Sequence, residues 1–334
     1  MTRAEIRGLK APDPALEERL RARLDEVEDA LGKAVRAESD FVTETASYLV
    51  RAGGKRFRPL LVILSGHFGD GTDPRLVPGA VAIEITHLAT LYHDDVIDEA
   101  DARRGIPSVN ARWDNTVAIL TGDFLFARAS EISSDLGSDV TKLLARTIAT
   151  VSDGQIREVS AAGRLDQTEE AYREIIQRKT ASLIATSCRL GGMLSDAPSE
   201  TVERLDDLGV AIGMAFQLSD DIMDVTSSEE ELRKAPGQDM REGVYTLPVL
   251  YALDDGAAGR ELKELLSQGP PDGAHLARAL DIVRGDGSLA KAREAVTQEV
   301  RRARTVAGDL PDCPARDALL RIAEFLAVRC GADI

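Results

Sequence analysis

Apolar residues recur at steps of three and four along most of the chain, which is the spacing of one face of an α-helix. Pro14 opens the first such stretch, which carries Leu16, Leu20, Leu24, Val27 and Leu31. A second stretch runs from Phe41 to Leu49 and stops before Gly53 and Gly54. No segment shows the alternation that is typical of β-strands, so the pattern predicts an all-α protein.

Prolines indicate where several further helices begin. Pro59, Pro78 and Pro314 are each followed by a helical pattern, and proline is well placed in the first turn of a helix. The remaining predicted helices cover residues 59–64, 78–95, 116–132, 138–164, 169–190, 201–225 and 314–330. Because no low-complexity linker or tandem repeat separates them, we predict one domain over residues 1–334.

The composition narrows the classes of function. The 334 residues carry a net charge of −16, and no basic tail offsets this acidity, so we expect no nucleic-acid binding. The N-terminus lacks the apolar core of a signal peptide, and no apolar run is long enough to span a bilayer. We therefore expect a cytoplasmic protein without a transmembrane segment. The three cysteines have no CxxC spacing and predict neither a disulfide framework nor a zinc site.

An acidic cluster, Asp94, Asp95 and Asp98, ends the helix that Pro78 opens. Asp94 and Asp98 are four residues apart, so their carboxylates share a helical face, where like charges destabilise a helix by about 0.2–0.5 kcal/mol. The helix dipole also disfavours anions at this end. A cation would offset both effects, and magnesium accepts carboxylates, waters and substrate phosphates together. Taken alone, the cluster is equally compatible with a solvated acidic face.

A second cluster, Asp220, Asp221 and Asp224, repeats this spacing after the apolar run 210–216. Acidic residues that follow a buried helix are expected to face a cavity rather than bulk water. Two such clusters, each at the polar end of an apolar helix, favour a magnesium and diphosphate site over a solvated surface.

Basic residues accompany both clusters. In the turn at residues 53–59, the glycines let the backbone approach a ligand closely, and Lys55 and Arg58 suit a phosphate. Other basic or polar candidates for binding a phosphate are Arg103, Arg104, Lys179, Thr180 and Lys234. His87 lies two helical turns before Asp94 and shares its face. It is either an ordinary core or surface histidine or a hydrogen-bond donor to a diphosphate.

This arrangement suits the transfer of an allylic group. Metal ions held by the two acidic faces would neutralise the charge on departing pyrophosphate. The delocalised cation that remains survives only where water is excluded. A second substrate, held by the basic turn, would attack this cation through its double bond and then lose a proton. Such a reaction needs no serine, cysteine or histidine nucleophile.

The motifs resemble those of the trans-isoprenyl diphosphate synthases, the polyprenyl synthetase family, from about Phe41 to Leu253. Residues 93–98 with 103–105 resemble the family's first aspartate-rich motif, and residues 216–224 resemble the second. The segments 53–59, 122–123, 179–180 and 237–248 also fit. The resemblance implies an all-α, isoprenoid synthase-type helical bundle around a deep central cavity, usually in a homodimer. It also implies an enzyme that condenses isopentenyl diphosphate with geranyl, farnesyl or geranylgeranyl diphosphate and releases pyrophosphate.

The resemblance also implies a role for each site residue. The magnesium ligands would be Asp94, Asp98, Asp220 and Asp224, with Asp95 and Asp221 completing the catalytic acidic groups. Isopentenyl diphosphate would be bound by Lys55, Arg58, His87 and Arg104. The allylic diphosphate would be bound by Arg103, Lys179, Thr180, Gln217 and Lys234, and Arg103 and Lys179 would also be catalytic.

Two departures from the family's pattern concern the allylic diphosphate. Val244 stands where many members have a lysine, which implies that an apolar side chain replaces one cation near the allylic diphosphate. Gln155 and Glu158 exchange the glutamate and glutamine that are common in that stretch. Both departures bear on the affinity for the allylic substrate rather than on the class of reaction.

The residues before the first motif indicate the length of the product. Short-chain enzymes of the family often place an aromatic residue where this chain has Ala89 or Thr90. The absence of an aromatic side chain at these two positions favours a product longer than farnesyl. We expect the long polyprenyl class that supplies quinone side chains. Alternatively, Phe124 or Phe126 on a neighbouring helix could block the channel in which the product grows. A geranylgeranyl product therefore remains an alternative.

Two other functions remain as alternatives. A terpene cyclase shares the helical fold and the first aspartate motif, but it carries a different second motif and needs no second diphosphate site. A noncatalytic subunit of a heteromeric synthase would tend to lose aspartates or basic ligands. This chain keeps both acidic clusters and the basic turn, so the synthase is the better interpretation.

Overall fold

The computed structural model describes residues 13–227, 236–254, 256–285 and 287–334. The chain is almost entirely helical in these ranges, which confirms the predicted fold class. It divides into two compact units, which we describe one at a time. The expected single domain and central cavity stay predictions. No described helix is both long enough and apolar enough to cross a bilayer.

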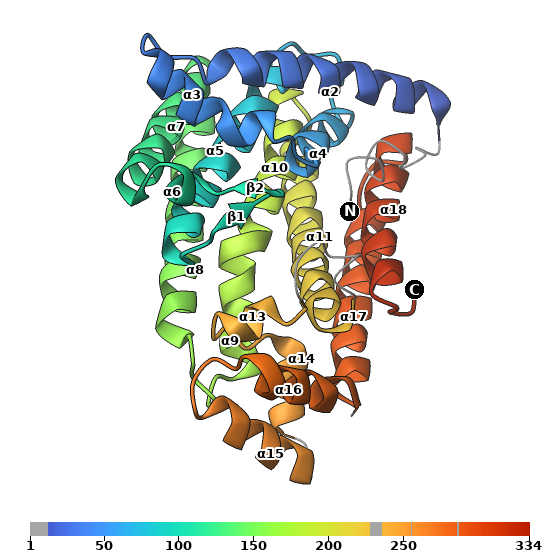
Figure 1. Cartoon of the computed structure of the whole chain (residues 1–334). Coiled ribbons are helices and arrows are strands. Elements are labelled where there is room, and N and C mark those ends of the chain that lie inside the picture. Colours follow the sequence, from blue (N-terminus) through green and yellow to red (C-terminus); the bar gives the residue numbers. More distant parts are fainter. Residues whose placement is uncertain (1–12, 228–235, 255, 286) are drawn as a thin grey trace. The chain divides into compact units, whose positions relative to one another are not determined.

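Unit 1 contains the chain up to Ile148, together with Leu183–Gly209 and Ala307–Leu319. Its elements are α2 (Pro14–Ala34), α3 (Asp40–Arg51), α4 (Phe57–Gly66), α5 (Leu76–Ile97), β1 (Ala102–Arg103), β2 (Ile106–Pro107), α6 (Val109–Arg112), α7 (Asn115–Asp135), the first part of α8 (Ser138–Ala161), most of α10 (Ser182–Leu194) and the first part of α11 (Ser199–Thr226). Figure 1 shows α2 to α8 in blue to green, α10 in yellow-green and α11 in gold.

Helix α5 is largely enclosed by its neighbours in unit 1. It packs against α2, α4 and α7, and its Ile83, Leu88 and Tyr92 are fully buried. A helix that is apolar on nearly every side must be covered on nearly every side. The first acidic cluster therefore lies at the end of a helix that its neighbours hold firmly in place.

Two helices begin earlier than their prolines predict. Helix α4 begins at Phe57 and α5 begins at Leu76, so Pro59 and Pro78 are each the third helical residue. Backbone N–H groups in the first turn have no helical acceptor, so proline fits at any of these positions. A proline thus marks the first turn of a helix rather than its first residue.

The expectation of a chain without strands was wrong at residues 102–107. Strands β1 and β2 form a short antiparallel ladder there. The two loop residues, Arg104 and Gly105, have φ angles of 56° and 79°, as in a two-residue type I′ turn. With two residues in each strand, this hairpin is too short to give a period-two pattern.

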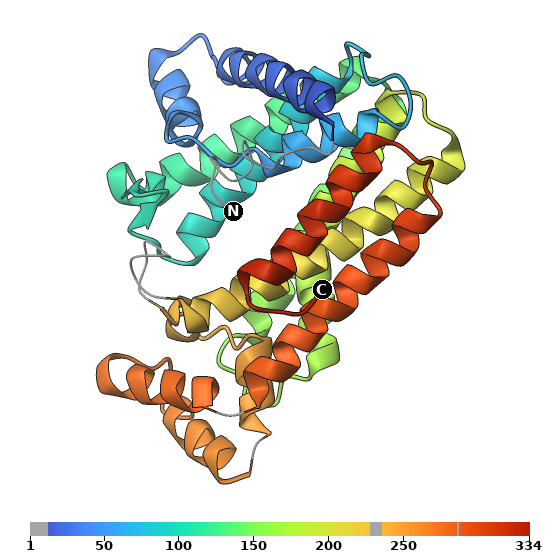
Figure 2. The same cartoon turned by 90° about the vertical axis from the view of Figure 1, so that its right-hand side faces the viewer.

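Unit 2 contains Ala149–Ser182, Val210–Val306 and Leu320–Ile334. Its elements are the rest of α8 and α11, α9 (Glu169–Ile176), the π-helical turn η1 (Gln177–Ala181), α13 (Gln238–Arg241), α14 (Leu247–Leu253), α15 (Gly256–Leu266), α16 (Gly273–Gly285), most of α17 (Ser288–Gly308) and most of α18 (Pro314–Arg329). Within this unit, α18 runs beside α11 and α17 (Figure 2), and Arg304 of α17 pairs with Glu324 of α18 at 2.7 Å.

The π-helical turn interrupts the helix predicted for residues 169–190. Gly154 of α8 and Gly213 of α11 both pack against it. A Cβ atom on Gly154 would lie 2.6 Å from the backbone nitrogen of Lys179, and one on Gly213 would lie 2.5 Å from Cα of Ala181. The two glycines therefore let α8 and α11 approach the backbone of η1 more closely than any side chain allows. Such π turns are frequent at functional sites.

We predict that Gly213→Ala lowers the free energy of unfolding by about 1–3 kcal/mol, because the added methyl group overpacks the contact with Ala181. Urea unfolding measures this change. Gly32→Ala in α2 is the matched control, since no atom lies within 4 Å of its added Cβ. The control should be neutral or stabilising, because alanine favours a helix over glycine. Equal stability of Gly213→Ala and the wild type would contradict the close contact between α11 and η1.

Candidate active site

The predicted site residues fall into two groups, one in each unit. The unit 1 cluster contains Lys55, Arg58, His87, Asp94, Asp95, Asp98, Arg103 and Arg104. The unit 2 cluster contains Lys179, Thr180, Gln217, Asp220, Asp221 and Asp224. Lys234 lies outside the described residues.

Asp95 is the buried member of the first aspartate motif. Its side chain is 0% exposed, and Nε of Arg103 donates to its Oδ1 at 2.5 Å. Burial raises the pKa of the Asp95 carboxyl, and the positive charge of Arg103 opposes that shift. Asp94 is half-buried and Asp98 is exposed. The two outer carboxylates are thus the accessible ones, while Asp95 and Arg103 join the end of α5 to the β-hairpin.

Arg56 in the basic turn has a structural role that the sequence did not reveal. It is 4% exposed and pairs with Glu28 of α2 at 2.8 Å and with Glu84 of α5 at 2.9 Å. Its φ angle of 53° lies in the left-handed region, a strained conformation that these ion pairs hold in place. Lys55 is exposed and Arg58 is half-buried, so the cations on either side of Arg56 are the more accessible ones.

Arg104 joins the β-hairpin to the basic turn. Its Nη1 donates to the carbonyl oxygen of Leu49 at 2.8 Å and to that of Gly53. Leu49 lies in the last turn of α3, whose carbonyl groups lack helical partners and attract a cation. A Cβ atom on Gly54 would lie 3.0 Å from Nη1 of Arg104 and 2.6 Å from Nη1 of Arg56. In this structure, Gly54 makes room for two arginines.

His87 lies in the electrostatic field of these arginines. Burial is the main cause that holds its pKa well below the ordinary value, and the charges of Arg58 and Arg104 add to it. The imidazole is therefore neutral at neutral pH, with one nitrogen able to donate and the other able to accept a hydrogen bond. The structure thus brings His87 near the predicted isopentenyl diphosphate ligands.

Gly122 and Asp123 of α7 accompany the first motif. A Cβ atom on Gly122 would lie 2.3 Å from Nε2 of His93, and Oδ1 of Asp123 lies 3.5 Å from that nitrogen. The ring of Phe126 lies 5.7 Å from the His93 ring. Of the two phenylalanines considered as a floor for the product, Phe126 therefore contacts the residue that precedes Asp94.

Asp221 is the most deeply buried aspartate of the second motif, with 1% exposure. The hydroxyl of Tyr172 donates to its Oδ2, and Nε2 of Gln217 donates to its Oδ1 at 2.9 Å. Burial raises the pKa of the Asp221 carboxyl to about 7, although both hydrogen bonds act to lower it. Oγ1 of Thr180 donates to Gln217 at 2.9 Å. A continuous hydrogen-bond network thus links η1 to the motif on α11.

The outer aspartates of the second motif differ in exposure. Asp224 is 2% exposed, and its Oδ2 accepts a hydrogen bond from the backbone of Asp239 at 3.3 Å. The Asp220 side chain is 40% exposed, and its Oδ1 accepts a hydrogen bond from Arg329 at 2.6 Å. Nε of Arg329 also donates to Ser219 at 2.7 Å. Sequence reasoning missed Arg329, because it ends the last helix and belongs to no recognisable motif.

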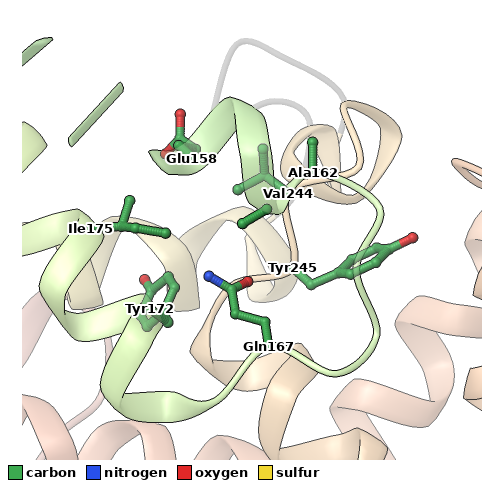
Figure 3. Close-up of a pocket in the computed structure, with 8 residues that line it drawn as sticks. Glu158, Ala162, Gln167, Tyr172, Ile175, Val244 and Tyr245 are labelled. Atoms are coloured by element: carbon green, nitrogen blue, oxygen red, sulfur yellow. The ribbon is translucent and has the colours of Figure 1, made fainter. Parts of the chain in front are cut away.

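Lys179 projects from η1 and pairs with Glu158 of α8. Glu158, Tyr172 and Val244 line a small pocket in unit 2 (Figure 3), which has room for roughly one water molecule. The position that carries a lysine in many members of the family is thus an apolar wall beside Glu158.

In the part of the chain that the structure describes, no three His, Cys, Asp or Glu side chains gather into a group that could hold a metal on its own. Magnesium does not need such a cage, because it keeps several waters and takes phosphate oxygens from the substrate. Two carboxylates at i, i+4 spacing in each motif supply the hard oxygen ligands that it prefers. The donor chemistry therefore fits magnesium.

The family model for polyprenyl synthetases matches residues 39–283. The chain belongs to this family. A nonaprenyl diphosphate synthase of Mycobacterium tuberculosis is 42% identical to this chain over 328 residues, which are 98% of each chain. Heptaprenyl diphosphate synthase component 2 of Geobacillus stearothermophilus is 40% identical, over 91% of this chain and 94% of the relative.

A solved structure agrees with the family assignment. The crystal structure of a geranylgeranyl pyrophosphate synthase from Corynebacterium glutamicum, complexed with calcium and isoprenyl diphosphate, matches with a TM-score of 0.85 and 39% identity. The match covers 97% of this chain and 100% of that chain. The predicted family and all-α fold class are thereby confirmed, and Arg329 lies beyond the residues that the family model matches.

We predict that His87→Gln reduces the loss of stability in mild acid. The folded-state pKa of His87 is lowered, so the unfolded chain takes up the proton first as the pH falls through about 6.5, and stability is lost below that pH. Glutamine has no such proton, so its unfolding free energy should fall less between about pH 7.5 and 5.5. His67→Gln is the control, because burial also lowers the pKa of His67 but less strongly. Identical pH profiles for His87→Gln and the wild type would contradict the lowered pKa of His87.

Proposed function

We propose that this protein is a cytoplasmic trans-prenyltransferase that condenses isopentenyl diphosphate with an allylic diphosphate, either geranyl, farnesyl or geranylgeranyl diphosphate. It releases pyrophosphate and makes a longer polyprenyl diphosphate. The observation that carries this proposal is the pair of complete aspartate motifs in a member of the polyprenyl synthetase family. In each motif the middle aspartate is buried and hydrogen-bonded, so its function is to fix the helix end that presents the outer acids.

The unit 1 cluster would bind isopentenyl diphosphate. Lys55 and Arg58 supply charge to the diphosphate, and the neutral His87 supplies a hydrogen bond. Arg104 contributes through its position, because it holds the hairpin against the carbonyl groups of Leu49 and Gly53. The cations of this cluster thus gather locally in a protein whose net charge is −16.

The acids of both clusters would hold magnesium through Asp94, Asp98, Asp220 and Asp224. Bound magnesium would stabilise the negative charge that develops on departing pyrophosphate. The allylic diphosphate would also be bound by Arg103, Lys179, Thr180 and Gln217. Lys234 stays a prediction, since it lies outside the described residues.

We propose a long product of the quinone side-chain class. The nonaprenyl and heptaprenyl synthases at 42% and 40% identity support this length, and Ala89 is a small buried residue before the first motif. Geranylgeranyl diphosphate is the second candidate product. It is favoured by the likeness to the Corynebacterium glutamicum enzyme at 39% identity.

Labelled isopentenyl diphosphate, magnesium and each of the three allylic primers test the reaction and the product length together. We expect magnesium-dependent incorporation into products longer than C20. Asp94→Asn and Asp220→Asn should each reduce kcat by about 100-fold or more, because each removes a metal ligand. Asp135→Asn at the exposed end of α7 is the control and should keep full activity.

Three outcomes would count against this proposal. Products that stop at C20 would identify a geranylgeranyl diphosphate synthase. Release of pyrophosphate without consumption of isopentenyl diphosphate would indicate a cyclase. No turnover by the purified chain would indicate a noncatalytic subunit.

We propose further that the protein is a homodimer. The family resemblance supports this state, and so do two exposed apolar residues on α7, Ile119 at 43% and Leu120 at 61% exposure. Large exposed apolar side chains that lie together often mark protein interfaces.

We predict that light scattering of the wild type gives twice the chain mass of 36.0 kDa, and that Leu120→Asp gives the monomer. The aspartate would bury an unpaired charge in the interface. Val328→Asp on α18, where the valine is 57% exposed, is the control and should stay dimeric. A monomeric wild type would instead support assembly with another subunit, as the name of the Geobacillus stearothermophilus component suggests for that protein.

A further inference from the structure

Lys179 is a predicted diphosphate ligand whose ammonium group already has an anionic partner. Its Nζ donates to Oε1 of Glu158, and the two side chains are 25% and 18% exposed. Such shielding weakens the screening of the pair by water and salt. A diphosphate that approaches Lys179 must therefore compete with Glu158 for the same ammonium group.

The described side chains that line the pocket beside Glu158 bring no positive charge to it. These uncharged residues are Ala161, Ala162, Gln167, Tyr172, Ile175, Val244 and Tyr245, and Figure 3 labels all of them except Ala161. Gln155, one turn earlier on α8, donates to the same Oε1 at 3.4 Å, and an amide compensates a carboxylate less well than an ammonium group does. The Glu158 carboxylate therefore depends on Lys179 for its charge balance.

The backbone of Lys179 is held in place while its side chain can change partner. Gly154 brings α8 against the Lys179 backbone, and Gly213 brings α11 against Ala181 at the end of η1. Lys179 can thus exchange Glu158 for a phosphate oxygen only by turning its own side chain. The position of Glu158 fixes where the ammonium group rests before a ligand arrives.

We propose that Glu158 sets the affinity of the unit 2 cluster for diphosphate by competing for the ammonium group of Lys179. Glu158 is thus a positioning residue that acts through Lys179. This inference rests on the proposed function, in which the competing anion is the allylic diphosphate or the pyrophosphate product. Each elongation step makes one pyrophosphate. A lower affinity for pyrophosphate therefore favours its dissociation before the next step.

Glu158→Gln tests the competition, because it keeps the shape of the side chain and removes its charge. Calorimetry with inorganic pyrophosphate and magnesium should show binding tighter by about three- to tenfold, the size expected for one charge-assisted contact. The KM for the allylic primer should fall by a similar factor, while the KM for isopentenyl diphosphate changes by less than about twofold. Glu174→Gln is the matched control. It removes the same charge from a partner of Arg178 and Arg157 and should leave pyrophosphate binding unchanged.

A double-mutant cycle shows whether the effect passes through Lys179. In a Lys179→Gln background, adding Glu158→Gln should produce no further tightening. Pyrophosphate binding to Glu158→Gln that is unchanged or weaker than in the wild type would overturn the inference, as would full tightening without Lys179. Failure of the proposed function looks different. The wild type would then consume no isopentenyl diphosphate, and the pyrophosphate titrations would still decide the role of Glu158.

Discussion

The burial of carboxylates within each aspartate motif is the constraint on which both clusters depend. Asp95 and Asp221 are 0% and 1% exposed, and a buried carboxylate is costly unless it is paired or hydrogen-bonded. Arg103 of the hairpin meets that need for Asp95, whereas Tyr172 and Gln217 meet it for Asp221. Arg103 is 8 residues from Asp95 and Gln217 is 4 residues from Asp221, whereas Tyr172 is 49 residues away. These partners fix the helix end from which the outer acids project.

The cations around these acids already have partners within the protein. Arg104 is bound to carbonyl groups, Lys179 to Glu158 and Arg329 to Asp220. Such contacts keep the clusters ordered and limit the repulsion among acids in a chain of net charge −16. If the clusters bind diphosphate as proposed, binding exchanges these partners rather than filling an open charged surface, and the affinity depends on the contacts that each cation gives up.

The sequence could predict the helices and the acidic motifs because both follow local spacing rules. Apolar periodicity located α5 and α11, and the i, i+4 spacing placed Asp94 and Asp98 at the correct helix end. The same rules could not separate Arg56, which is buried between two glutamates, from its more accessible neighbours. Arg329 escaped for a similar reason, because its contact with Asp220 spans 109 residues of sequence. Burial and long-range pairing leave no local pattern.

Because of the π-helical turn η1, the number of residues in this segment matters as well as their identity. A π turn holds one more residue than the α-helical turn that it replaces, and each residue of an α-helix turns the chain by about 100°. Residues on the two sides of η1 are thus out of phase with a regular helix, and Lys179 and Thr180 face their partners because of that offset. Loss of a single residue here would turn the two sides by about a quarter of a circle relative to each other. The identity of Lys179 and the number of residues around it are therefore separate requirements, and substitution at one position changes only the first.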